Sequence, residues 1–268
     1  MLECVVNVSE GRDAAVLAAL AAAAGPDLLD VHTDPHHHRS VLTLVGEDAP
    51  RAVATAALAR IDLRQHAGEH PRLGAVDVVP FVPLSGSRMA DAERARDAFA
   101  AWWAGTHHVP CFLYGTQRTL PEVRRLAFRG LEPDQGPAHS HPTAGASAVG
   151  ARRPLVAYNV WLDADLATAR WIAKTSRGPG IRALGLEIGD GVQVSMNLFD
   201  PESVGPADAF DLVVRLAAEA GATVEGAELV GLVTASVLHA VPPARWSALD
   251  LGEDRTVEAR LERRASGG

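Results

Sequence analysis

The sequence predicts an α/β protein made of two successive βαββαβ units, and three observations lead to that prediction. Short apolar runs rich in β-branched residues alternate with longer runs of helix formers along most of the chain. The order of these runs in the first half recurs in the second half, although no repeat of individual residues accompanies it. The length of 268 residues is about 1.8 times that of a typical domain of ~150 residues, which is compatible with one large domain or two small ones.

The elements of the first half follow from composition and from the residues at their ends. Asp13 is suited to cap the alanine-rich helix that begins at Ala14, and Gly25-Pro26 ends that helix. A second helix opens near Pro50, because proline is tolerated in the first turn. We expect strands at 2–6, 28–31, 40–45 and 76–82 and helices at 14–24 and 50–61.

The second half has the same order of elements. Asp190-Gly191 is a strong signal for a tight turn between two strands, and Gly221 ends the last helix. We expect strands at 155–162, 181–188, 192–198 and 230–233 and helices at 165–175 and 206–220. Each half therefore has the split βαβ, or ferredoxin-like, arrangement.

A long stretch joins the two halves. It begins with a predicted helix at 90–104 and a strand at 109–114. Residues 130–150 follow, which are rich in Gly, Pro and His and have no sustained periodicity. Loops of this length inside compact domains are usually functional or mobile. We place an N-terminal subdomain at 1–150, a C-terminal subdomain at 151–240 and an irregular, then charged, tail at 241–268.

Composition limits the classes of function. A net charge of −8 with a pI near 5.7 argues against a nucleic-acid or anionic-membrane binder, which should be basic. The N-terminus lacks the basic region of a signal peptide, and the longest apolar run, 14–24, is too short to cross a bilayer. Cys4 and Cys111 form no disulfide framework. We therefore expect a cytoplasmic protein with small-molecule substrates, and neither nucleic acid nor membrane as a partner.

The densest polar segment is RQHAGEHPR at 64–72, and it supplies the candidate catalytic residue His70. An imidazole can accept or donate a proton near neutral pH. Pro71 favours an extended backbone at His70, and Glu69 and Arg72 are suited to orient it or to bind an anionic substrate. The alternative is a surface turn with solvated charges.

Two groups of histidines suggest a metal site, and each has a simpler alternative. Residues 32–39 contain His32, Asp34 and three consecutive histidines, which are ligand types that zinc accepts. Adjacent histidines point in different directions, however, and neither an HExxH helix nor a cysteine pair completes a set. A polar loop is the alternative here and at His139 and His141. We expect no metal, and a metal-dependent hydrolase remains an alternative function.

Two further polar patterns are compatible with ligand binding. Residues 7–13 form a strand-to-helix turn whose backbone N–H groups can bind an anion, with simple helix capping as the alternative. Gln193, Ser195 and Asn197 share one face of a predicted strand, and Asn159 lies in another strand. Amides and a hydroxyl on such a face favour a ligand cleft over an ordinary solvent-exposed face.

Motifs for several other chemistries are missing from the sequence. No GxGxxG opens a βαβ unit and no GxxxxGK[ST] is present, which disfavours folds that bind nucleotide phosphates. No GxSxG is present either, and neither cysteine lies in a nucleophile motif.

Several segments resemble, in the same order, those of the glutamate formimidoyltransferase (formiminotransferase) family. The most specific is GEHPRLGAVDVVPFVPL at 68–84. The others include ECVVNVSEGRD at 3–13, GPAHSHPTAGASAVGARRPLVAYNV at 136–160 and QVSMNL at 193–198. The resemblance implies transfer of the formimino group from N-formimino-L-glutamate to tetrahydrofolate, giving 5-formiminotetrahydrofolate and L-glutamate in histidine degradation. Tetrahydrofolate is then the co-substrate.

The resemblance also implies a site and an arrangement of the subdomains. His70 takes the place of the family's catalytic acid/base, and two mixed sheets are expected to face each other across a ligand tunnel with the helices outside. The implied folate-binding residues are Gly136, Pro137, Ala138, His139, Ser140, His141, Pro142, Thr143, Ala144 and Gly145.

Further substrate-binding residues are assigned from charge and place. Arg39, Arg72 and Arg152 are expected to bind carboxylates of the two substrates. The full candidate set is Asn7, Ser9, His32, His38, Arg39, Glu69, Arg72, Arg152, Asn159, Gln193, Ser195 and Asn197. His32 and His38 replace an acidic residue and an asparagine of typical members, so a non-catalytic folate-binding homologue is an alternative.

We expect a single transferase unit, because the sequence shows no long helical segment resembling the cyclodeaminase that is fused in some relatives. A homodimer and a separate cyclodeaminase are the protein partners that this leaves open.

Overall fold

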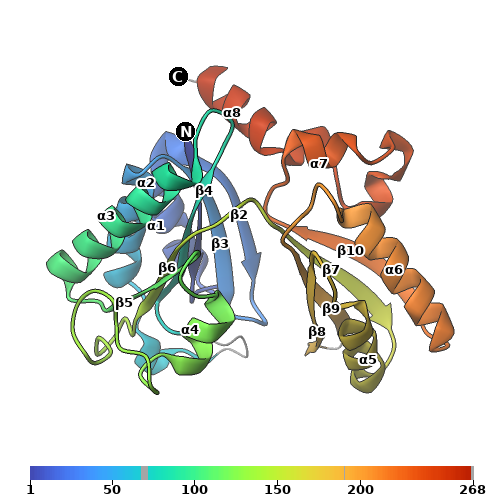
Figure 1. Ribbon diagram of the computed structural model, residues 1–268, viewed down its shortest axis with the longest axis horizontal. Helices are drawn as coiled ribbons and strands as arrows, with labels where there is room; N and C mark the ends of the chain where they lie inside the picture. The colour runs from blue at the N-terminus through green and yellow to red at the C-terminus, as the bar shows by residue number, and fades with distance from the viewer. Residues whose placement is uncertain (68–71, 190, 267–268) are drawn as a thin grey trace. The chain divides into compact units, whose positions relative to one another are not determined.

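The computed structural model describes residues 1–67, 72–189 and 191–266 (Figure 1). The chain divides into two compact units, residues 1–153 and 154–268. Each unit has its own sheet and its own apolar core. The predicted fold class, α/β with two ferredoxin-like subdomains, is confirmed by the order of elements within each unit.

The first unit opens with a βαββαβ module. Its elements are β1 (Leu2–Val8), α1 (Ala14–Ala24), β2 (Leu28–Asp34), β3 (Arg39–Val45), α2 (Asp48–Leu58) and β4 (Val76–Pro83). The four strands pair antiparallel in the order β2-β3-β1-β4, which is the ferredoxin-like order. As predicted, the Asp13 side chain caps α1, where it accepts from the N–H groups of Ala15 and Val16.

Four more elements extend this sheet: α3 (Met89–His107), β5 (Cys111–Tyr114), α4 (Leu120–Leu126) and β6 (Ser147–Ala151). β6 inserts between β4 and β5 and is parallel to both. The expectation of a loop over 130–150 is therefore wrong at its end. The small residues of β6 give it only a weak strand pattern in the sequence. Gly150 is required in this strand, because a Cβ there would collide with the Tyr114 ring.

The two faces of this six-stranded sheet are covered differently. α1, α2 and α3 pack on one face, where Leu20, Val53 and Phe99 belong to one core with Val6. α4 covers part of the opposite face through Val123. On β1 and β3 this second face carries polar side chains, among them those of the candidate site.

The second unit repeats the module with β7 (Val156–Asp163), α5 (Leu166–Ser176), β8 (Ile181–Ile188), β9 (Gly191–Leu198), α6 (Pro206–Glu219) and β10 (Thr223–Val230). Its strands are antiparallel in the order β10-β7-β9-β8. The last strand was expected at 230–233 and lies earlier. Two glutamates, a glycine and a register shift between Val224 and Gly226 interrupt its apolar alternation.

The end of the chain packs on the second unit. α7 (Ala235–His239), three 3₁₀ turns (Pro243–Arg245, Ser247–Leu249 and Glu253–Arg255) and α8 (Val257–Ser266) follow β10. Val241, Leu249 and Leu251 belong to the same core as α5 and α6, so the end of the chain is part of the second unit. No helix in the described part of the chain is long and apolar enough to cross a membrane.

Candidate active site

The candidate catalytic His70 and its neighbour Glu69 lie outside the described residues. The chain on either side of 68–71 is described. The site is therefore built from these flanking residues and from what they contact in the first unit.

On the amino-terminal side, His66 follows a 3₁₀ turn (Leu63–Gln65) and packs on His38. Their rings stack with centroids 4.1 Å apart and planes inclined by 25°. His66 Nε2 lies 3.0 Å from the His38 carbonyl oxygen, and Arg72 donates to the His66 carbonyl at 2.9 Å. Because a carbonyl only accepts, His66 carries its proton on Nε2. Burial, above all, lowers the pKa of His66.

His38 joins this stack to the turn after β1. Its backbone is left-handed (φ 51°), and its Nδ1 accepts the Gly11 N–H at 3.1 Å. Burial and the neighbouring His66 lower its pKa. The Glu10 carboxylate accepts from the N–H groups of Gly11, Arg12 and Asp13 at 2.7–2.9 Å. The N–H groups that the sequence offers to an anion thus bind a carboxylate of the chain itself.

On the carboxyl-terminal side, the fully buried Asp77 collects three donors. Its Oδ1 accepts the Leu73 N–H at 2.6 Å, and its Oδ2 accepts from Arg39 Nη1 and from Arg124 Nη2 at 2.7 Å. Arg39 also donates twice to Asn7 Oδ1, from Nε at 3.2 Å and Nη2 at 2.8 Å. Burial alone would raise the pKa of Asp77, but Arg39, then Arg124 and the Leu73 N–H, bring it down to about 2.

The second half of the predicted folate-binding stretch lies against the chain that follows Arg72. Ala75 donates its N–H to the Ala144 carbonyl at 2.9 Å, and the Ser9 hydroxyl donates to the Gly74 carbonyl at 2.8 Å. His141 Nδ1 accepts the Ala144 N–H at 3.1 Å, so its proton is on Nε2. Residues 138–140 are exposed. The contacts thus join residues 141–146, rather than the whole stretch, to the segment that follows His70.

Two other predicted residues of the first unit are Arg152, which lies beside Tyr114, and His32, which lies on β2. Burial raises the pKa of the Tyr114 hydroxyl to about 12, against the opposing effect of Arg152 beside it. His32 is half-buried on β2, opposite Val41 of β3.

Asp34 binds the segment that contains the three consecutive histidines, residues 36–38. Its carboxylate accepts the backbone N–H groups of His36 and His37 and lies 2.6 Å from His37 Nδ1. Among residues 1–67, 72–189 and 191–266, no three His, Cys, Asp or Glu side chains form a group that could hold a metal ion.

The predicted residues of the second unit form a group of their own on the sheet face opposite α5 and α6. Asn159 Nδ2 donates to Glu228 Oε2 at 2.9 Å, and Ser195 pairs with Asn159 across the two strands. Gln193 is 1% exposed, and neither atom of its amide has a partner among the described residues. Asn197 is exposed. Polarity is thus concentrated at the centre of this face, as the sequence predicts.

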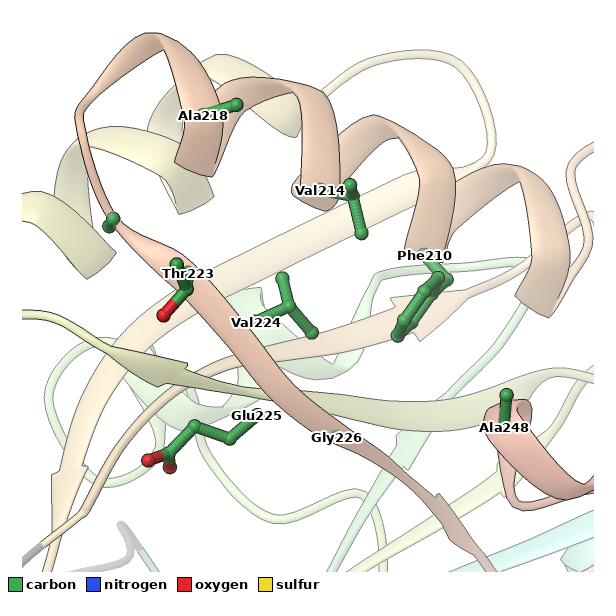
Figure 2. Close-up of a pocket in the computed structure, with 9 residues that line it drawn as sticks. Phe210, Val214, Ala218, Thr223, Val224, Glu225, Gly226 and Ala248 are labelled. Atoms are coloured by element: carbon green, nitrogen blue, oxygen red, sulfur yellow. The ribbon is translucent and has the colours of Figure 1, made fainter.

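A separate groove in the second unit contains none of the predicted residues. It has a volume of about 500 Å³ between α6 and β10 (Figure 2). Its lining is mainly apolar and includes Phe210, Val214 and Val224, with Glu225 as the charged member. No site residue of the sequence analysis is associated with it.

Sequence reasoning missed four residues that organise the site: Glu10, His66, Asp77 and Arg124. Asp77 had a detectable signal, because a lone carboxylate in a run of buried apolar residues requires partners. Arg124 had none, since its role depends on where α4 packs.

Comparisons with known proteins show which family the chain belongs to. A family model described as the formiminotransferase domain, N-terminal subdomain, matches residues 1–152. A glutamate formimidoyltransferase of Streptococcus pyogenes serotype M1 is 38% identical over 270 residues, covering 89% of this chain and 90% of the relative. One of Thermoplasma acidophilum is 33% identical over 99% of both chains.

A formimidoyltransferase-cyclodeaminase of Sus scrofa is 36% identical over 275 residues, and the match covers 51% of that protein. These matches confirm the resemblance noted in the sequence. The chain belongs to the formiminotransferase family.

Proposed function

We propose that this protein transfers the formimino group of N-formimino-L-glutamate to tetrahydrofolate, giving 5-formiminotetrahydrofolate and L-glutamate, as a step of histidine degradation in the cytoplasm. The observation that carries the proposal is the match over nine-tenths of a glutamate formimidoyltransferase. The contacts on either side of the segment 68–71 support it, because they join Asn7, Ser9, His38, Arg39 and Arg72 to the chain around that segment.

The reaction requires one bond to form and one to break. N5 of tetrahydrofolate attacks the formimino carbon, which becomes tetrahedral, and the bond from this carbon to the glutamate nitrogen then breaks. The attacking amine loses a proton and the departing glutamate nitrogen gains one. A single positioned acid/base can do both in turn, and such transfer typically supplies about 10²–10⁴-fold in rate.

We assign the proton transfer to His70, with Glu69 as its neighbour. Arg39 and Arg72 are assigned to carboxylates of the substrates, and Arg152 likewise. Three of the five N–H groups of Arg39 are used by Asn7 and Asp77. The remaining two have no partner among the described residues, and we assign them to a substrate carboxylate.

Residues 136–145 are proposed to bind the folate, and the amides of the second unit to complete the binding site. The buried Gln193 amide, which has no partner among the described residues, supports the second assignment, because burying such an amide is costly unless a ligand uses it. The tunnel between facing sheets, the tetrahydrofolate co-substrate, the homodimer and a separate cyclodeaminase remain predictions.

The test is an assay of glutamate release with both substrates present. We expect release to require tetrahydrofolate, and His70→Ala to lower kcat by about 10²–10⁴-fold. His239→Ala is the matched control, since this exposed histidine of the second unit contacts Glu253 alone among described carboxylates. A folded His70→Ala protein with the parent rate would contradict the assignment.

The same assay separates the alternative functions. A metal-dependent hydrolase of a formimino compound would release formamide without tetrahydrofolate and would respond to chelators. A non-catalytic homologue would bind folate in calorimetry without turnover.

A further inference from the structure

Asp77 joins four separate parts of the first unit through one buried carboxylate. Its side chain is 0% exposed. The donors come from Leu73, two residues beyond the segment 68–71, from Arg39 at the start of β3, and from Arg124 on α4. Through Arg39 it also reaches Asn7 on β1. This group thus holds Leu73, which follows the segment that carries His70.

The amino-terminal end of the same segment has a separate anchor. His66 stacks on His38 and is bonded to the His38 carbonyl, and Arg72 donates back to the His66 carbonyl. The two ends are therefore fixed by different contacts. Asp77 is the charged member of the second anchor, and it also determines where the Arg39 guanidinium points.

We propose that Asp77 is a positioning residue for formimino transfer, which fixes the Leu73 end of the His70 segment and orients Arg39. This rests on the proposed function, in which His70 moves the proton. Asp77 itself is buried among its donors and acts only through them.

Two substitutions separate the roles of the carboxylate. Asp77→Asn keeps an oxygen to accept the Leu73 N–H but loses the charge that holds two guanidinium groups together. Asp77→Ala loses both. Misplacement of a reacting group by about 1 Å can cost on the order of 100-fold in rate. We therefore expect kcat to fall about 10- to 100-fold in Asp77→Asn and further in Asp77→Ala. For the substrate that Arg39 does not bind, KM should change less than about threefold in both variants.

The second unit offers a matched control. Asp250 has a related pattern with one arginine and a 38% exposed side chain, since it accepts the Leu229 N–H at 2.8 Å and lies 2.6 Å from Arg255. It has no part in the candidate site. Asp250→Asn should lower the unfolding temperature and leave kcat within about twofold. An equal loss of kcat in Asp77→Asn and Asp250→Asn, or no loss in Asp77→Asn, would overturn the proposal.

A second pair of variants leaves the buried ion pairs intact. Leu73→Pro removes the N–H that Asp77 accepts, and Leu73→Ala removes only the side chain. We expect kcat of Leu73→Pro to be about tenfold below that of Leu73→Ala, and equal values would contradict the proposed anchor. This comparison does not depend on whether the Asp77 variants fold.

Hydrogen exchange provides a readout that is independent of turnover. The amides of residues 72–77 should exchange faster in Asp77→Ala than in Asp77→Asn and in the parent protein. If the parent protein released no glutamate, the proposed function would fail. Unchanged exchange in Asp77→Ala would instead refute the anchor alone.

Discussion

The imidazole rings of His38 and His66 stack face to face, 4.1 Å between centroids, at the entrance to the segment that carries His70. Burial lowers both pKa values, and the neighbouring His66 lowers that of His38 further, so the folded state disfavours the protonated form of each ring. The unfolded chain binds protons more readily, so the free energy of unfolding decreases as the pH falls below about 6.5, the ordinary histidine pKa.

We predict that His66→Gln weakens this pH dependence between pH 7.5 and pH 5, measured by urea unfolding at several pH values. His239→Gln, at an exposed histidine of the second unit, is the control variant for comparison. If the free energy of unfolding of His66→Gln depended on pH as in the parent protein, the histidine pair would not be the source of the pH dependence.

Acid stability depends on Asp77. Its native pKa of about 2 lies below the ordinary value of 3.8. The stabilisation is therefore present above pH 4 and is lost as the pH falls from about 4 to about 2. The difference corresponds to about 2 kcal/mol. Asp77→Asn should be less stable at pH 7 and should lose less stability over this acid range, which urea unfolding at each pH would measure.

The close approach of two backbone segments requires Gly74. A Cβ at this position would collide with the Ala146 carbonyl oxygen, and backbone cannot move aside as a flexible side chain can. We predict that Gly74→Ala destabilises the protein by about 1–3 kcal/mol and reduces transfer activity. Gly105→Ala, in α3 with nothing near its Cβ position, should instead stabilise by about 0.5–1 kcal/mol. Equal unfolding free energies for the two variants would contradict the argument.

We predict that Gln193 lowers the stability of the protein while contributing to the binding of tetrahydrofolate. Its amide is buried and lacks partners in the described part of the protein. Gln193→Leu should therefore raise the free energy of unfolding by about 1 kcal/mol while raising KM for tetrahydrofolate. Gln117→Leu, at an exposed loop residue, should change neither. A destabilised Gln193→Leu protein with parental KM would show that the amide has a structural role.

The sequence predicted the two βαββαβ modules because the residues that begin and end each helix act through local contacts. Asp13 caps α1 and Gly221 follows α6 regardless of tertiary context. β6 could not be found in this way, since Ser147–Ala151 is composed of small residues. It is a strand only because β4 and β5 lie on either side of it.

The candidate site was predictable in its residue types and less so in its connections. Asn7, Ser9, His38, Arg39 and Arg72 were selected from sequence and do lie in one group of contacts. Their partners Asp77 and Arg124 were not selected. Asp77 on β4 and Arg124 on α4 are 47 residues apart in the sequence and meet only in the folded unit. Single-sequence patterns do not contain such long-range pairing.

The insertion of β6 between β4 and β5 has a consequence for how the chain is made. A ribosome releases the whole first module before the strand that completes its sheet has emerged, so the edge of β4 waits for more than sixty residues of further synthesis. Exposed strand edges invite pairing with other chains. Nascent chains that stall before Ser147 should therefore depend on chaperones, and shortened versions of the first unit that end there should aggregate.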